Sequence, residues 1–359
     1  MSPRPSPPDA AIPPGWRCRR LRRCYPWSSP PAPEPSMDRP LTAPDPDRHW
    51  HQTGAQHRRL IEATRDLSPL RTAVVHPCDA PSLAGALAAW REGLIEPLLV
   101  GPRARIEAAA DELGETLDTL RLIDTPHSHA SAERAVRLAA DGEAEALMKG
   151  ALHTDELMSA AVTRQAGLRT ERQMSHVYAL DVPSYPRPLL ISDAALHIAP
   201  DLATKADIIQ NAIDLARAIG IDRPRVAVLS AVETVRATLP STIEAAALCK
   251  MAERGQIEGG VLDGPLAIDN AVSLSAARQK GLDSPVAGQA DILIAPDLEA
   301  ANMVAKLLIH LAGAQAAGLV AGARVPIMLT SRADDVETRL ASAALAQLLV
   351  RRQAEAGAS

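Results

Sequence analysis

The chain has 359 residues, of which 47% are hydrophobic and 23% charged, a balance typical of a globular protein long enough for two domains. A formal net charge of −5 and only seven aromatic residues (four Trp, three Tyr, no Phe) argue against a nucleic-acid-binding protein. No apolar run approaches the roughly 20 residues of a membrane span. The four cysteines have neither metal-ligand nor disulfide-framework spacing, which predicts a reducing, cytoplasmic compartment.

The first 36 residues differ in composition from everything that follows. They hold 11 of the 30 prolines and six arginines and show no apolar periodicity, so we expect this segment to be disordered. The basic run 17–23 resembles the start of an export signal, but no apolar segment follows it. We interpret the stretch as translated upstream sequence before a true start at Met37; a genuine flexible tail is the alternative.

From about Arg71 onward, short apolar runs alternate with helical patterns. The predicted strands are 72–76, 97–101, 120–124, 146–149, 189–193, 225–230, 290–296 and 324–331. The predicted helices are 82–92, 131–141, 155–166, 204–219, 241–254, 298–314 and 336–350. This alternation predicts an α/β fold with mostly parallel sheets and helices on both faces.

The last predicted strand leads directly into polar chemistry. Val325–Leu329 reads as a buried strand, and Thr330, Ser331 and Arg332 follow at its carboxyl end. Ligands bind at the carboxyl ends of strands in open α/β sheets, and the helix start that follows favours an anion. The alternative is that Ser331 is a turn residue and Arg332 a solvated surface charge.

Carboxylates follow that strand as well. Asp334 and Glu337 have the Asp-x-x-Glu spacing of an N-cap with its capping box, and the helical pattern begins at Val336. A cap alone would explain Asp334, because such caps are common.

Other predicted strands also end in polar segments. Gly150 permits close backbone approach after strand 146–149, and Thr154 is placed to cap the next helix. Lys149, His153 and Thr154 are therefore candidate anion ligands, with a glycine turn and an ordinary cap as the alternative. Asp297 follows the strand predicted at 290–296 and reads as a natural N-cap.

Several familiar signatures are absent from the sequence. The chain has no Gly-x-x-x-x-Gly-Lys-Ser/Thr loop, no Gly-x-Gly-x-x-Gly after a strand, no His-Glu-x-x-His and no Gly-x-Ser-x-Gly. An ATPase, a metal-dependent hydrolase and a serine esterase therefore have little support.

Taken in order, seven segments resemble the phosphate acetyltransferase and phosphate butyryltransferase family. They are 147–155 (LMKGALHTD), 167–170 (GLRT), 174–178 (MSHVY), 191–193 (ISD), 263–271 (DGPLAIDNA), 295–303 (APDLEAANM) and 325–334 (VPIMLTSRAD). The resemblance implies reversible transfer of a short acyl group between coenzyme A and inorganic phosphate, with no tightly bound cofactor. It also implies a homodimer of two α/β domains, 60–179 plus 319–359 and an inserted 180–318, with the active site in the cleft between them.

The resemblance carries roles to particular residues. Ser331 and Arg332 match the family's active-site Ser-Arg pair, and Asp334, Asp335 or Glu337 matches its catalytic aspartate, of which we favour Asp334. The expected substrate-binding residues are Lys149, Gly150, His153, Thr154, Arg169, Asp297 and Asn302, with Arg169 contacting coenzyme A or phosphate.

Independently of the family resemblance, these residue types are suited to acyl transfer between a thioester and phosphate. A bidentate guanidinium holds phosphate in line for attack on a thioester, and a carboxylate can act as base for a thiol whose pKa is about 8.5. Two other classes remain as alternatives: a metal- and NAD(P)-dependent decarboxylating dehydrogenase of similar architecture, and a non-catalytic coenzyme-A-binding protein of the same fold.

Overall fold

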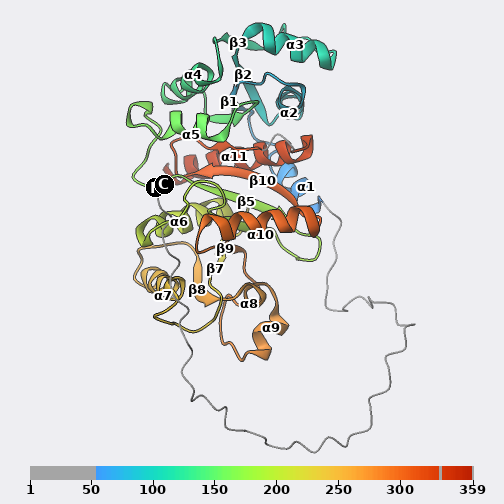
Figure 1. The fold of residues 1–359 in the computed structure, drawn as a ribbon. Helices are drawn as coiled ribbons and strands as arrows, with labels where there is room; N and C mark the ends of the chain where they lie inside the picture. Colours follow the sequence, from blue (N-terminus) through green and yellow to red (C-terminus); the bar gives the residue numbers. More distant parts are fainter. Residues whose placement is uncertain (1–53, 331–333, 358–359) are drawn as a thin grey trace, which may run out of the picture. The chain divides into compact units, whose positions relative to one another are not determined.

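A computed structural model of the chain describes residues 54–330 and 334–357 (Figure 1). The proline-rich segment 1–36 lies outside the described residues, as does Met37. The strands are β1 (Leu70–Val75), β2 (Ile95–Gly101), β3 (Arg121–Asp124), β4 (Ala146–Lys149), β5 (Ser175–Asp181), β6 (Leu189–Ser192), β7 (Arg225–Leu229), β8 (Val261–Leu266), β9 (Ile292–Ile294), β10 (Gln315–Ala321) and β11 (Ile327–Met328).

The helices lie between these strands. They are α1 (Ala55–Glu62), α2 (Ala80–Arg91), α3 (Arg103–Leu113), α4 (Ser128–Ala140), α5 (Thr154–Val162), η1 (Arg164–Ala166), α6 (Leu202–Ala218), α7 (Pro240–Glu253), α8 (Ile268–Val272), α9 (Leu274–Gln279), α10 (Leu298–Leu311) and α11 (Val336–Gly357). None of the helices in the described ranges is both long and apolar enough to cross a bilayer.

All the strands join one sheet in the order β3-β2-β1-β4-β11-β10-β5-β6-β9-β7-β8. The first five are parallel to one another, as are the last four, and β10 and β5 connect the two parallel blocks by antiparallel pairing. The predicted fold class, a mostly parallel α/β sheet covered by helices, is confirmed. The division into 60–179 plus 319–359 and 180–318 stays a prediction.

The sequence located most of the parallel strands but missed the strands β5, β8 and β10. Strand 146–149 is observed with the predicted bounds, whereas the strand predicted at 324–331 is only Ile327–Met328. β5 carries His176 and Tyr178 among its apolar residues, so it lacks the uninterrupted apolar run that indicated the parallel strands.

The two faces of the sheet are packed differently. On one face a single hydrophobic core runs under α2, α3, α11, α6 and α7, from Leu83 to Leu248. On the other face there are two separate cores, one under α4 and α5 and one under α8, α9 and α10. The interrupted face therefore has a gap in its packing near the middle of the sheet.

Residue alternation places particular side chains on the interrupted face. Leu147 and Leu329 pack in the core under α4 and α5, so Lys149, two residues after Leu147, lies on the same face. Gly318 pairs with Tyr178 across the central strands and puts no side chain there. A Cβ at Gly318 would lie 2.8 Å from the Leu329 carbonyl oxygen, which shows how closely the backbone of this floor is packed.

The structure corrects the predicted N-terminus of α11. Thr338 donates its backbone N–H to Asp335 Oδ1 at 2.8 Å, so Asp335 and not Asp334 caps the helix. The Glu337 carboxylate accepts a hydrogen bond from Gln315 Nε2 at 2.9 Å, at the start of β10. The predicted capping box of Asp334 and Glu337 is therefore wrong by one residue, because the helix begins at Val336.

A glycine in α2 provides a test of the packing between α2 and α11. A Cβ built on Gly85 would lie 2.1 Å from Arg339 Cδ, inside the buried core. Helix propensity alone predicts that Gly85→Ala stabilises the protein by about 0.5–1 kcal/mol, whereas this overlap predicts a loss of about 1–3 kcal/mol. We expect urea unfolding to show the loss; a stabilised Gly85→Ala variant would contradict the packing described.

Candidate functional site

A hollow of 340 Å³ opens over the central strands on the interrupted face, and we call it the site hollow. Its lining comes from the ends of β4 and β11, the start of α5, the strand β5 and the loop after β6. The lining residues are Lys149, Leu152, His153, Thr154, His176, Tyr178, Ala195, Leu329 and Thr330. The carboxyl ends of β4 and β11 meet here, as the sequence analysis expected for a ligand site.

Lys149 supplies a positive charge from the end of β4. The residue is 4% exposed, and its Nζ donates a hydrogen bond to the Thr330 carbonyl oxygen at 3.0 Å. This contact joins residues 181 positions apart in the chain. A buried ammonium that lines a hollow is suited to binding an anion.

A second buried cation, Arg339, reaches the same strand end from α11. Arg339 is 2% exposed and donates from NH1 to Thr330 Oγ1 at 2.8 Å. Burial lowers the pKa of Arg339 below its ordinary value. The carboxylates of Asp334, Asp79 and Asp335 oppose this shift but do not cancel it. Sequence reasoning missed Arg339, which reads as an ordinary helix residue; Gly85, which leaves space for its side chain, was the one available signal.

The three candidate carboxylates after Arg332 have different surroundings. Asp335 caps α11, and Glu337 is bound to Gln315. Asp334 is half-buried, and its charge acts on Tyr178 in the site hollow: burial raises the pKa of Tyr178, and the Asp334 carboxylate raises it further. Of the three carboxylates, Asp334 is therefore the one whose charge acts on a residue that lines the site hollow.

The loop after β4 has the close approach expected of Gly150. A Cβ there would lie 2.6 Å from the Val75 carbonyl oxygen, and the Gly150 N–H donates to the same oxygen at 2.9 Å. The sequence suggested Thr154 as the cap of the helix α5. Thr154 is instead the first residue of α5, and the N-cap is His153. His153 and Thr154 both line the site hollow.

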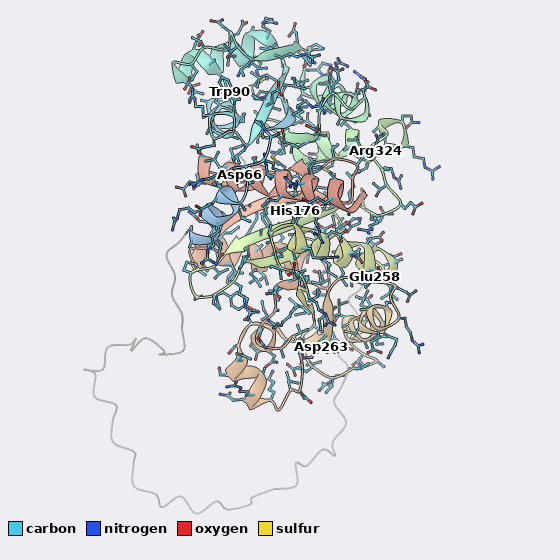
Figure 2. All side chains as sticks on the ribbon, turned by 180° about the vertical axis from the view of Figure 1, so that it is seen from behind. Asp66, Trp90, His176, Glu258, Asp263 and Arg324 are labelled. Carbon is cyan, nitrogen blue, oxygen red and sulfur yellow. The ribbon has the colours of Figure 1, made fainter. Side chains whose placement is uncertain are left out.

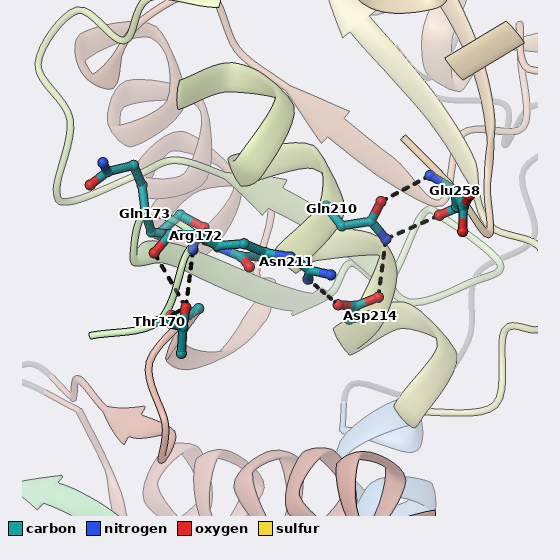
Figure 3. Close-up of polar contacts among 9 residues, drawn as sticks. Thr170, Arg172, Gln173, Gln210, Asn211, Asp214 and Glu258 are labelled. Carbon is teal, nitrogen blue, oxygen red and sulfur yellow. Dashed lines mark hydrogen bonds and ion pairs between the residues drawn. The ribbon is translucent and has the colours of Figure 1, made fainter. Parts of the chain in front are cut away.

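A second hollow of 360 Å³ lies beside the same loops, and we call it the arginine hollow because Arg169 and Arg172 line it. Arg169 is exposed, and its backbone bridges to Ala323. The Arg172 guanidinium contacts Asp214 Oδ2 at 2.5 Å, in a network that extends through Gln210 to Glu258 (Figure 3).

The loop 193–197 separates the two hollows. Ala195 lines the site hollow, and His197 lines the arginine hollow. Asp193 holds the loop, since its carboxylate accepts hydrogen bonds from the Ala195, Leu196 and His197 backbones and from His197 Nδ1 at 2.7 Å. Burial alone would raise the pKa of Asp193, but these hydrogen bonds outweigh it and lower the pKa below the ordinary value.

Three of the predicted binding residues, Gly150, Asn302 and Asp297, do not line either hollow. Asn302 donates from Nδ2 to the Ala194 carbonyl oxygen at 3.0 Å, so it supports the loop 193–197 from behind. Asp297 caps α10 by accepting the Ala300 N–H at 2.8 Å, as its sequence context suggested.

The structure does not address Ser331 and Arg332, which lie outside the described residues. Thr330, which precedes Ser331, lines the site hollow, and the charge of Asp334, two residues after Arg332, acts on Tyr178 in that hollow. Within 54–330 and 334–357, no three His, Cys, Asp or Glu side chains gather in a way that could hold a metal ion.

Comparison with known proteins gives one consistent result. Residues 128–347 match the model of the family described as phosphate acetyl/butaryl transferase. A phosphate acetyltransferase of Rhizobium meliloti is 59% identical over 304 residues, covering 85% of this chain and 96% of that protein. A phosphate butyryltransferase of Clostridium beijerinckii is 39% identical over 293 residues, covering 82% and 97%.

A solved structure gives the same answer. The branched-chain phosphotransacylase from Enterococcus faecalis V583 matches with a TM-score of 0.68 at 28% identity, covering 78% of this chain and 99% of that one. The family resemblance noted from seven short segments is thus confirmed along the length of the relatives. This chain belongs to the phosphate acetyl/butyryl transferase family.

Proposed function

We propose that this protein transfers a short acyl group reversibly between coenzyme A and inorganic phosphate, giving acyl phosphate. The observation that carries the proposal is the pair of buried cations, Lys149 and Arg339, that both donate hydrogen bonds to Thr330, a residue of the site hollow. The charge of Asp334 acts on Tyr178 in the same hollow. Buried positive charge suits phosphate, and a nearby carboxylate suits proton transfer. The family to which the chain belongs carries out this class of reaction.

The reaction requires one proton to move. A phosphate oxygen attacks the thioester carbonyl carbon, and the carbonyl electron pair passes to its oxygen. When that pair returns, the carbon–sulfur bond breaks and the thiolate leaves. The proton of HPO₄²⁻ ends on the sulfur, and we assign Asp334 to carry it, because of the three candidate carboxylates it is the one whose charge acts on the site hollow.

The remaining roles follow from charge and position. We assign Lys149 to bind phosphate in the site hollow. The positive N-terminal end of α5, at His153 and Thr154, also favours an anion there. We assign Arg332 as the bidentate phosphate ligand and Ser331 as a hydrogen-bond donor to the oxyanion that forms in the transition state. Gly150 keeps the β4 loop close to β1, and Asn302 and Asp297 support surrounding segments.

We assign coenzyme A to the arginine hollow. Arg169 is exposed there, and a guanidinium is suited to the phosphates of the coenzyme. We expect acetyl-coenzyme A to be the main substrate, with propionyl- and butyryl-coenzyme A as further substrates. The sequence is 59% identical to a phosphate acetyltransferase and 39% identical to a phosphate butyryltransferase, which favours the acetyl group.

Release of free thiol tests this function. Purified protein with acetyl-, propionyl- or butyryl-coenzyme A should release coenzyme A only when phosphate is present. Release at the same rate without phosphate would make the protein a thioesterase, and NADH formation with added magnesium would point to the dehydrogenase alternative.

Lys149→Met tests the buried ammonium. In the wild type, phosphate should raise the melting temperature by mass action, by an amount that grows with phosphate concentration. Lys149→Met removes the charge while keeping the length of the side chain, so this shift should disappear and the KM for phosphate should rise about tenfold or more. Lys250→Met, an exposed residue paired with Glu253, is the control and should keep the shift. A full shift in Lys149→Met would exclude Lys149 from the phosphate site.

Arg332→Ala should lower kcat/KM about a hundredfold or more, a loss on the order of 3 kcal/mol, because the guanidinium holds both phosphate and developing charge. Arg332→Lys should recover only part of this, since an ammonium lacks two-pronged geometry. Steady-state kinetics with phosphate as the varied substrate measure both. Normal phosphate kinetics in Arg332→Ala, with a lowered melting temperature, would make the residue structural.

We also propose that the protein is a homodimer that uses α10. Met303, Leu307 and Leu311 are 63%, 55% and 82% exposed and recur every four residues along one face of the helix. Such a stripe, repeated on a second copy, suits a twofold interface. Light scattering should give a dimer mass for the wild type and a monomer mass for Leu307→Asp. Ile243→Asp, which changes an exposed residue of α7, should stay dimeric. A dimeric Leu307→Asp variant would exclude this surface.

Two further expectations belong to this proposal. The two cores on the interrupted face support a domain made of 60–179 plus 319–359 and an inserted domain 180–318. Cys78 and Cys249 carry free thiols, which supports a reducing cytoplasmic compartment.

A further inference from the structure

His176 is a buried histidine at the site hollow that neither the family comparison nor the sequence analysis assigned a role. It lies near the start of β5, between the two parallel blocks of the sheet (Figure 2). The residue is 1% exposed and lines the site hollow together with Lys149 and Tyr178.

The main chain of His176 is fixed on both sides. Its backbone N–H donates to Asp193 Oδ1 at 3.1 Å, and its carbonyl oxygen accepts from Ser192 Oγ at 3.0 Å. Its ring stands edge-on to Tyr178 with 4.5 Å between the ring centroids. The ring is therefore held in place, yet its nitrogen Nδ1 is sealed from solvent and has no hydrogen-bond partner in the described part of the chain.

The other ring nitrogen, Nε2, is directed toward the floor of the site hollow. A Cβ built on Gly318 would lie 3.0 Å from Nε2, so this nitrogen lies over a floor position without a side chain. Tyr178, paired with Gly318, lies next to the same space.

The protonation state follows from burial. Burial lowers the pKa of His176 to about 4, although the charge of Asp193 opposes the shift. The ring is thus neutral at pH 7 and carries one proton. A sealed N–H without a partner is rarer in proteins than an unsatisfied acceptor, so the proton belongs on Nε2, over Gly318.

We propose that His176 is a catalytic residue whose Nε2–H donates a hydrogen bond to the acyl carbonyl oxygen. A fixed neutral donor stabilises the negative charge that develops on this oxygen when phosphate attacks. Phosphate itself is left to the buried cation Lys149, which lines the same hollow. The inference rests on the proposed acyl transfer.

Three substitutions test the role of Nε2. His176→Phe keeps an aromatic ring beside Tyr178 but has no donor, and it should lower kcat about a hundredfold with little change in the KM for phosphate. His176→Gln places an amide near the position of Nε2 and should recover at least tenfold of that loss. His176→Asn reaches only the position of Nδ1 and should not recover it.

Folding and function are separated by two controls. Phosphate should still raise the melting temperature of His176→Phe, because the cations that bind it are intact, and this shows that the site is folded. His57→Gln is the matched control for His176→Gln, because it replaces another buried histidine by glutamine. His57 is 4% exposed and lies outside both hollows, so this variant should keep normal kcat.

Several results would overturn the assignment. They are a kcat for His176→Phe within threefold of wild type, equal rates for the Gln and Asn variants, or a raised KM for phosphate at unchanged kcat. A wild-type protein that releases no thiol with phosphate would instead overturn the proposed acyl transfer itself.

Discussion

The buried contact between Lys149 Nζ and the Thr330 carbonyl oxygen is the constraint on which the site depends. It joins the ends of β4 and β11 through residues 181 positions apart in the chain, and it keeps an ammonium out of water. Burying a charge is costly, and in a low-dielectric setting the same charge attracts an anion more strongly than it would in water. The burial that costs stability therefore also creates affinity for phosphate in the site hollow.

The packing of the sheet explains where this site can exist. One continuous core, on the face opposite the interrupted face, packs α2, α6 and α11 against both parallel blocks. On the interrupted face the core is divided in two, and Gly318 leaves the floor of the gap without a side chain. A rigid layer thus supports an open one, an arrangement that allows buried polar groups to keep precise positions while substrates enter.

The sequence predicted the parts of this fold that follow from local pattern. The apolar residues 146–148, followed by Lys149, gave β4 with the right bounds, and Asp297 was recognised as a cap from its neighbours alone. It did not predict β5, whose His176 and Tyr178 break the apolar run because they face the site hollow. Arg339 was missed for a similar reason, since its burial depends on a glycine 254 positions earlier in the chain, at residue 85.

A crystal structure with bound phosphate would show whether Lys149 binds the anion. We expect a tetrahedral anion in the site hollow, at about 2.7–2.9 Å from Lys149 Nζ and close to Thr154 at the start of α5. We also expect Lys149 to keep its contact with Thr330 while it binds the anion. Phosphate found only in the arginine hollow, with none within hydrogen-bond distance of Lys149, would rule out Lys149 as the phosphate ligand.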